Sequence, residues 1–442
     1  MKILLIDKGG YFLDFALRCR EAGHEVRWFL GKLRGGDRNP QGDGFNLTKV
    51  TDWAPSMKWA DLIILPDNSV YMADLEVWRR RGFPIWGPNV EVTQWEMNRE
   101  TGMEVLESVG IRTIDSHKFR RVSEAQDFLR ANPRRFVSKV NDDNDSKALS
   151  YVSKSAKDLM FMLQKWEKLG TLKSEFVFQE FVKGTEVAVG GWFGPGGFSS
   201  WFLENFEHKK LMNGEIGVNT GEMGTVLKYT QESALAEYFL RPLEGHLYRA
   251  GYTGYVDVAA IVARDGTPYP LEFTTRPGWP LFEIQQALHP DPCGWMFDML
   301  EGKNTFKPSS NVAVGVVVTM PDFPYHSMPF AEKVGFPLYG WDKIPEKNLH
   351  LSQVMMGEAP GDSLEMEPIP VSAGECVCTI SGTGETVEAA QTAAYRNVKR
   401  LALPNSPMYR TDIGDRLRED LPELQQHGWM TSWTYGDGNG KG

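Results

Sequence analysis

Residues 255–274 read YVDVAAIVARDGTPYPLEFT, two apolar, strand-like runs on either side of Asp265-Gly266. An Asp-Gly pair between such runs is typical of a tight β-hairpin turn. The pattern predicts that each strand carries one inward carboxylate, Asp257 on the first strand and Glu272 on the second. Carboxylates on adjacent strands suit Mg²⁺, a hard cation that binds oxygen ligands and phosphates together. Two outward-facing, solvated carboxylates are the alternative.

Two stretches upstream of the hairpin carry features of a nucleotide site. Lys139 ends a predicted strand and Lys147 follows across a polar loop, so two compact charges can converge on a triphosphate. Residues 179–182 (Gln-Glu-Phe-Val) form an extended segment whose backbone can present a carbonyl and an N–H to adenine. Glu186 follows and can accept both ribose hydroxyls. Each feature alone also fits solvated strand-end lysines or an edge strand entering a turn, so their order carries the argument.

The composition is that of an ordinary globular protein. A chain of 442 residues is too long for one core, so two to four subdomains are expected. The net charge of −10 argues against a nucleic-acid surface, and no apolar run reaches the ~20 residues of a membrane helix. The start, residues 1–7, has no signal-peptide cleavage site. Four scattered cysteines indicate a reducing cytoplasm, with Cys376 and Cys378 expected as buried strand thiols rather than zinc ligands.

Strands alternate with helices over residues 1 to about 95, which predicts a parallel, Rossmann-like layer with sites at the strand ends. An amphipathic helix is expected over 98–109, ended by Gly110, and a compact α+β unit over about 116–188. Strands dominate from 187 to about 315. The final third is expected to hold a long strand at 312–320, a helix at 388–401 and a Gly-rich end.

These residues, in this order, resemble an ATP-grasp ligase, and more narrowly the glycinamide ribonucleotide synthetase (phosphoribosylamine–glycine ligase) family. Residues 207–210 (EHKK) and 217–224 (GVNTGEMG) resemble that family's DHK(R) and GPNTGGMG stretches. Residues 252–254 (YTG) resemble its Tyr-x-Gly turn before the metal strands. Residues 384–387 with Tyr395, then 409–414 (YRTDIG), resemble its closing domain. The resemblance covers essentially the whole chain.

The resemblance implies that ATP phosphorylates the carboxylate of glycine, and that the amine of 5-phosphoribosylamine attacks the acyl phosphate. Lys139 would contact phosphates, the backbone of 180–182 adenine, Glu186 ribose and Glu272 Mg²⁺. Arg99 stands where the family has a lysine, which keeps the charge but changes its geometry. The candidate ATP-binding residues are Arg99, Lys139, Lys147, Gln179, Glu180, Phe181, Val182 and Glu186. The candidate metal ligands are Asp257, Glu272 and Thr274, and the candidate catalytic residues are Arg276 and Lys209. The candidate substrate-binding residues are Gly9, Gly10, Asp67, Asn219, Thr220, Gly221, Met223 and Gly278.

Several departures from the family pattern touch the substrate side. The family's glycine-rich phosphate loop is here residues 141–146 (NDDNDS), whose carboxylates would repel a triphosphate unless the loop turns outward or binds a cation. GREHA becomes 10–14 (GYFLD), GPEAPL becomes 65–70 (LPDNSV), and RFGDPE becomes 276–280 (RPGWP). The metal-ligand Asn becomes Thr274, and Asp257 compensates in a way nearer D-alanine–D-alanine ligase.

The expected fold is therefore a multidomain α/β and α+β protein with an ATP-grasp core. We expect the segments to be an N-terminal Rossmann-like substrate domain (1–97), a linker helix and small lid subdomain (98–188), a central subdomain (189–315), a C-terminal closing domain (316–434) and a disordered tail (435–442). The expected cofactors are ATP and Mg²⁺, with Mn²⁺ as an alternative ion. The expected partners are small-molecule substrates, with no nucleic acid or membrane, for a cytoplasmic monomer or homodimer.

Three hypotheses for function remain open on the sequence alone. The first is the family reaction, which joins glycine to phosphoribosylamine. The second keeps the ligase mechanism but joins another amino acid or amine, as the N-terminal losses and Trp279 suggest. The third is a nucleotide-binding protein without catalysis, which the carboxylates of the Asp-rich loop motivate.

Overall fold

The structure is a computed structural model, and it describes residues 1–33, 35–140, 150–171 and 175–436. The Asp-rich loop, Lys147 and all but the first two residues of the predicted tail lie outside these ranges. Of the helices in the described residues, none combines the length and the apolar character that crossing a membrane requires.

The first part of the chain forms a parallel five-stranded sheet in the order β3-β2-β1-β4-β5. Its strands are β1 (Lys2–Asp7), β2 (Glu25–Leu30), β3 (Thr48–Val50), β4 (Leu62–Ile64) and β5 (Ile85–Trp86). Helix α1 (Leu13–Glu21) follows β1, and α2 (Met72–Arg79) follows β4. This arrangement confirms the expected Rossmann-like layer. The sequence placed the second helix too late, at 77–81, because its first turn exposes polar side chains and buries only Leu75.

Two helices lead from this sheet to a small second one. They are α3 (Val90–Met97) and α4 (Arg99–Ser108), and the side chain of Asn98 caps the start of α4. The four-stranded antiparallel sheet has the order β6-β9-β7-β8. It consists of β6 (Ser116–Phe119), β7 (Phe136–Val140), β8 (Tyr151–Val152) and β9 (Phe176–Glu180), with α5 (Val122–Ala131) and α6 (Ala156–Leu169). Both helices pack onto the sheet around one aromatic-rich core.

An eight-stranded sheet organises the rest of the molecule, in the order β16-β15-β10-β11-β14-β17-β22-β19. Its strands are β10 (Gly184–Gly194), β11 (Gly197–Glu207), β14 (Gly224–Thr230), β15 (Gly254–Ala263), β16 (Pro268–Thr274), β17 (Val312–Thr319), β19 (Leu349–Leu351) and β22 (Cys376–Gly384). The hairpin predicted from residues 255–274 is the pair β15–β16. The predicted boundary after residue 315 falls inside β17, and the division into domains remains a prediction.

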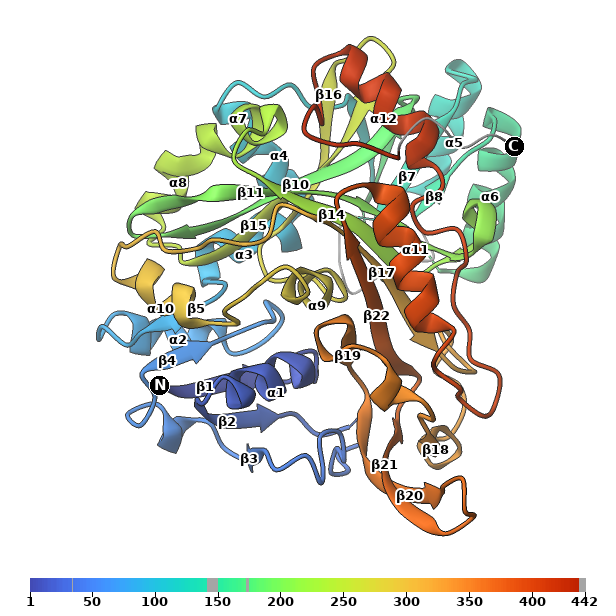
Figure 1. The fold of residues 1–442 in the computed structure, drawn as a ribbon. Coiled ribbons are helices and arrows are strands. Elements are labelled where there is room, and N and C mark those ends of the chain that lie inside the picture. Colours follow the sequence, from blue (N-terminus) through green and yellow to red (C-terminus); the bar gives the residue numbers. More distant parts are fainter. Residues whose placement is uncertain (34, 141–149, 172–174, 437–442) are drawn as a thin grey trace.

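Helices and a third sheet complete the chain (Figure 1). The helices are α7 (Ala234–Phe239), α8 (Glu244–Arg249), α9 (Leu281–Gln286), α10 (Gly294–Leu300), α11 (Val387–Val398) and α12 (Leu417–Gln426). The remaining strands are the hairpin β12 (Lys210–Met212) and β13 (Ile216–Asn219), and a sheet of β18 (Val334–Pro337), β21 (Met366–Ala373) and β20 (Val354–Pro360). In Figure 1, α7 and α8 lie above the large sheet, and α9, α10 and the N-terminal sheet lie below it. Cys376 and Cys378 are both on β22, as expected of strand thiols, and Cys378 is buried.

Candidate active site

One face of the large sheet collects the predicted metal ligands. In the β15–β16 register, Asp257 lies opposite Thr274 and Ala259 lies opposite Glu272. Residues that pair directly across strands, and residues two apart along a strand, share a sheet face. Asp257, Glu272 and Thr274 are therefore neighbours on one face. Asp257 is 3% exposed, whereas 47% of the Glu272 side chain is exposed.

The neighbouring strands add further polar groups to the same face. Gly190 of β10 lies opposite Asp257, and Ala188 lies opposite Asn205 of β11. By the same alternation, Glu186 and Glu207 at the strand ends face this side. A Cβ at Gly190 would lie 1.9 Å from the Tyr255 hydroxyl oxygen, so glycine is required for these side chains to cross β10. The site is thus assembled from four adjacent strands.

Lys209 connects the carboxylates at the open end of this face. Its Nζ lies 2.9 Å from Glu186 Oε1, 3.1 Å from Glu207 Oε2 and 3.5 Å from Glu272 Oε1. Burial acts to lower the pKa of Lys209, but the three carboxylates hold this pKa well above its ordinary value. Lys209 therefore remains an ammonium ion and links three different strands.

Lys139 and Arg99 bring two more cations to the same place. Arg99 at the start of α4 donates to the Leu271 carbonyl at 2.6 Å and lies 3.3 Å from Glu272 Oε2. Burial and the positive charge of Arg99 lower the pKa of Lys139 to about 7, whereas Glu272 and Glu186 act in the opposite direction. Lys139 from the small sheet thus lies close to Arg99 and Glu272 beside the large one. A lysine held at such a cost is suited to an anionic ligand.

The predicted adenine segment is the connection from the small sheet to the large one. The Glu180 N–H donates to the Asp115 carbonyl at 3.0 Å, and Arg134 Nη2 lies 2.6 Å from the Glu180 carboxylate. The guanidinium of Arg135 lies 3.5 Å from the ring centroid of Phe181. The side chain of Gln179 is buried within β9, and Val182 is half-buried. The segment between the two sheets is therefore held in place from the small sheet.

The N-terminal sheet contributes the loop after β1. Asp7 accepts hydrogen bonds from the backbone N–H groups of Gly10, Tyr11 and Phe12, at 2.8 to 3.0 Å, and from the indole of Trp28. Burial raises the pKa of Asp7 to about 6 despite these donors. Gly10 has φ of 77°, and a Cβ there would meet the Gln41 side chain at 2.2 Å. Gly9 is exposed beside it.

Arg276 lies between this N-terminal loop and the large sheet. It forms an ion pair with Glu96 at 3.2 Å, and the other Glu96 carboxylate oxygen accepts from Asn68 and from the Thr275 N–H at 2.7 Å. Burial acts to lower the pKa of Arg276, but Glu96 and Asp67 hold it above its ordinary value. Gly278 follows, and its carbonyl accepts from Phe282 at the start of α9. The sequence gave no role to Glu96, although it joins three elements at this point.

The segment 217–224 folds back over β11. The Thr220 N–H donates to the Lys209 carbonyl and the Met223 N–H to the His208 carbonyl, both at 2.8 Å. Asn219 and Gly221 are exposed, whereas Met223 is 1% exposed. The predicted substrate residues of this segment therefore divide into an exposed pair and buried neighbours that fix the backbone.

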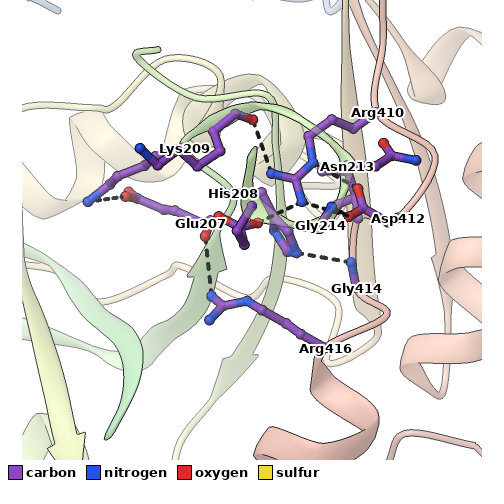
Figure 2. Close-up of polar contacts among 12 residues, drawn as sticks. Glu207, His208, Lys209, Asn213, Gly214, Arg410, Asp412, Gly414 and Arg416 are labelled. Carbon is purple, nitrogen blue, oxygen red and sulfur yellow. Dashed lines mark hydrogen bonds and ion pairs between the residues drawn. The ribbon is translucent and has the colours of Figure 1, made fainter. Parts of the chain in front are cut away.

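The C-terminal segment holds this assembly from the other side, as Figure 2 shows. Arg416 Nη2 donates to the carbonyls of Glu186 and Glu207, at 3.4 and 3.2 Å. Arg410 is 1% exposed and donates to the Lys210 carbonyl at 3.0 Å. The Gly414 N–H donates to His208 Nε2 at 3.3 Å, and burial lowers the pKa of His208 to about 3, so this imidazole is neutral. The sequence linked residues 409–414 to a closing domain but assigned no role to Arg410 or Arg416.

Comparisons with known proteins agree with this geometry. The family described as "Phosphoribosylglycinamide synthetase, ATP-grasp (A) domain" matches residues 98–280. A phosphoribosylamine–glycine ligase from Neisseria meningitidis serogroup B is 23% identical over 440 residues, which cover 94% of this chain and 99% of the relative. One from Ralstonia nicotianae is 24% identical over 374 residues, covering 80% and 83%. The crystal structure of phosphoribosylamine–glycine ligase from Thermotoga maritima superposes with a TM-score of 0.68 at 21% identity, over 93% of this chain and 100% of that one.

The chain is a divergent member of the phosphoribosylamine–glycine ligase family. Its fold is the ATP-grasp fold, as the resemblance in the sequence predicted. The fold alone extends further, to an L-amino acid ligase from Bacillus licheniformis with a TM-score of 0.55 at 14% identity, over 92% of this chain and 98% of that one. In an ATP-grasp protein the face described above lies where two sheets meet. Of the predicted ATP-site residues, only Lys147 lies outside the described ranges.

Proposed function

We propose that this protein is an ATP-dependent carboxylate–amine ligase that forms ADP and phosphate. The carboxylate oxygen of the substrate attacks the γ-phosphorus of ATP, and the bond to the ADP oxygen breaks. An amine then attacks the acyl carbon, phosphate leaves with the bonding electron pair, and the amine loses one proton. The family reaction, in which glycine joins 5-phosphoribosylamine, is the first assignment of substrates.

The observation that carries the proposal is the meeting of Lys139, Arg99 and Lys209 with Glu186 and Glu272 where the two sheets join. Positive side chains from two separate sheets have no reason to be held at one point unless an anion binds between them. A triphosphate is an anion of the required size and charge. The lysines supply compact charges and Arg99 a fixed fork of donors.

A divalent cation fits the residues on this face. Burial and the charge of Glu207 raise the pKa of Asp257 to about 7, so this carboxylate lacks the positive neighbour that would balance it. Asp257, Glu272 and the Thr274 hydroxyl would hold Mg²⁺ or Mn²⁺, and the ion would neutralise charge on the phosphates. Among the protein's own groups, we assign Lys139 and Arg99 to the phosphates, Glu186 to the ribose and residues 180–182 to adenine. Arg276 and Lys209 would stabilise the negative charge of the acyl transfer.

The experiment that tests this function is trapping of the acyl phosphate with hydroxylamine. Hydroxylamine attacks an acyl phosphate to give a hydroxamic acid and phosphate, whichever amine is the natural acceptor. Incubation with ATP, Mg²⁺ and each of the common amino acids is expected to give equal amounts of ADP and hydroxamate for at least one amino acid. ATP binding without ADP formation for any amino acid would instead support the hypothesis of a non-catalytic nucleotide-binding protein.

The second candidate function is the same chemistry with a different acceptor amine or amino acid. It is favoured by the N-terminal loop, where Tyr11 is 45% exposed at the position that follows the glycines and Arg276 is paired with Glu96. Once the activated amino acid is known, replacing hydroxylamine with phosphoribosylamine separates the two candidates. Amide formation with phosphoribosylamine as the best amine supports the family reaction, and formation with another amine supports the alternative.

A further inference from the structure

Glu222 is a buried carboxylate that neither the fold nor the proposed metal site explains. The residue is 4% exposed, and its Oε1 has no hydrogen-bond partner among the described residues. The backbone bonds of Thr220 and Met223 to Lys209 and His208 hold it beside the end of β11. It stands where the GPNTGGMG pattern of the family has a glycine. A buried carboxylate oxygen without a donor is costly, so a positively charged group is expected to compensate it.

Asn205 supplies a second, independent observation at the same place. It is fully buried on β11, and its Nδ2 donates to Asp257 Oδ2 at 3.3 Å. Because the amide nitrogen is turned toward Asp257, the amide oxygen points away from it. This Oδ1 also has no partner among the side chains that the structure describes. Two buried acceptors thus lack donors within one small region.

The charges around these acceptors are negative. Burial, Glu207 and Asp257 together raise the pKa of Glu222 well above its ordinary value. Lys209 acts in the opposite direction, but it already contacts the carboxylates of three other residues. We call Asn205, Glu207, Glu222 and Asp257 the acidic subsite. Its edge toward solvent is Glu207, whose side chain is 23% exposed.

Arg276 provides a positive charge on the side of Glu207 that faces the N-terminal loop, and Glu207 helps to raise its pKa. A zwitterion matches this arrangement of one cation and several carboxylates. An α-amino acid has a carboxylate for the guanidinium and an ammonium group with three N–H donors for the acceptors. A carboxylic acid without the amino group would leave the acidic subsite uncompensated.

We propose that the acidic subsite binds the α-ammonium group of the substrate whose carboxylate is activated, with Glu222 and Asn205 as specificity-determining residues. The substrate class is therefore the α-amino acids. This inference rests on the proposed ligase function and adds to it the group that selects the substrate. Glu222 distinguishes this chain from family members with glycine at this position, so its removal should weaken amino acid binding without removing the nucleotide site.

The test measures equilibrium binding by calorimetry with the full chain, Mg²⁺ and a non-hydrolysable ATP analogue. The probes are glycine, L-alanine, L-aspartate and L-lysine, each compared with its des-amino acid: acetate, propionate, succinate and 6-aminohexanoate. At least one amino acid is expected to bind about tenfold or more tightly than its des-amino acid, since a hydrogen bond to a charged group is worth that much. Glu222→Gln and Glu222→Gly are expected to abolish that preference.

Glu204→Gln is the matched control. Glu204 is the neighbouring buried carboxylate on the opposite face of β11, where Ser233 and the Trp433 indole both donate to it at 2.7 Å. This variant should bind the amino acid as the unmodified protein does. Circular dichroism melts check that all variants fold, and the comparison of amino and des-amino acids in the unmodified protein needs no variant.

Three results would overturn the inference. They are equal affinity for every amino acid and its des-amino acid, an unchanged preference in folded Glu222→Gln, or loss of one bound Mn²⁺ ion in that variant by spin-resonance titration. The last result would assign the acidic subsite to a second divalent cation. Failure of the ligase function itself reads out separately, as absence of hydroxamate in a protein that still prefers amino acids.

Discussion

Lys209 Nζ lies 2.9 Å from Glu186 Oε1, so a lysine beside β11 holds the carboxylate that is proposed to accept the ribose hydroxyls. The same lysine contacts Glu272, the proposed metal ligand on β16. Nucleotide and metal binding should therefore exchange ion pairs that the protein already contains for contacts with the ligand. This exchange keeps the carboxylates compensated in both states and places the cation where phosphate arrives.

Removal of Lys139 is expected to abolish turnover. Lys139→Ala should lower the rate of ADP release by about 100-fold or more, because it removes a positioned charge from the phosphate site. Lys139→Arg should keep part of the activity, since it retains the charge with a different geometry. Lys168→Ala, an exposed lysine of α6, is the control and should match the unmodified protein. Full activity in Lys139→Ala would remove Lys139 from the site.

The carboxylates of β15 and β16 are expected to set the requirement for the divalent ion. Glu272→Gln should raise the Mg²⁺ concentration for half-maximal ADP release by about tenfold or more, because a neutral amide is a weaker ligand. Asp257→Asn should act in the same direction. Asp265→Asn changes a carboxylate at the exposed turn of the same hairpin and should leave the Mg²⁺ dependence as it is. A Mg²⁺ dependence that is identical in all three variants would contradict this assignment.

Arg416 is expected to position the nucleotide site through the backbone. Its guanidinium donates to the carbonyls of both Glu186 and Glu207, so Arg416→Ala should let the ends of β10 and β11 move apart. The KM for ATP should rise by about tenfold, with a smaller change in kcat. Arg416→Lys should recover part of the loss, and Arg418→Ala, with a side chain that is 69% exposed, should have no effect. A change in kcat alone would argue against a positioning role.

Glu283 is expected to make stability depend on pH. Burial raises the pKa of this α9 carboxyl from 4.5 to about 8, although Thr379 and Ser352 donate to it. Between pH 4.5 and 8 the folded protein therefore binds more protons than the unfolded chain, so stability falls as pH rises through this window. The slope is at most about 1.4 kcal/mol per pH unit.

Glu283→Gln should remove this slope and raise the Tm at pH 7.5, because the amide stays neutral in both states. Thermal melts at several pH values between 5 and 8 measure the difference between the variant and the unmodified protein. Parallel curves across that range would show that Glu283 titrates normally.

The sequence predicted the parts of the site that local patterns encode. The hairpin follows from Asp265-Gly266 and the apolar runs on either side of it, and its register brings Asp257 and Glu272 to one face. The Rossmann-like layer follows from the alternation of strands and helices. These predictions needed only strand periodicity and turn chemistry.

Contacts between distant segments could not be predicted in this way. Glu96 bonds to Asn68 and Thr275, and Arg416 reaches carbonyls more than 200 residues away, although neither shows a local pattern. Glu222 did leave a signal, since it replaces a glycine in a motif that the sequence otherwise shares. Its burial and its position beside Asp257 became evident only in three dimensions.

A crystal structure with Mg²⁺ and a non-hydrolysable ATP analogue tests the central claim most directly. The distances to measure are those from Lys139 Nζ to the nearest phosphate oxygen and from the metal ion to the carboxylates of Asp257 and Glu272. We predict roughly 3 Å for the first and about 2.1 Å from the metal to at least one carboxylate oxygen. A nucleotide bound away from this face, or one whose phosphates do not approach Lys139 and Glu272, would contradict the account.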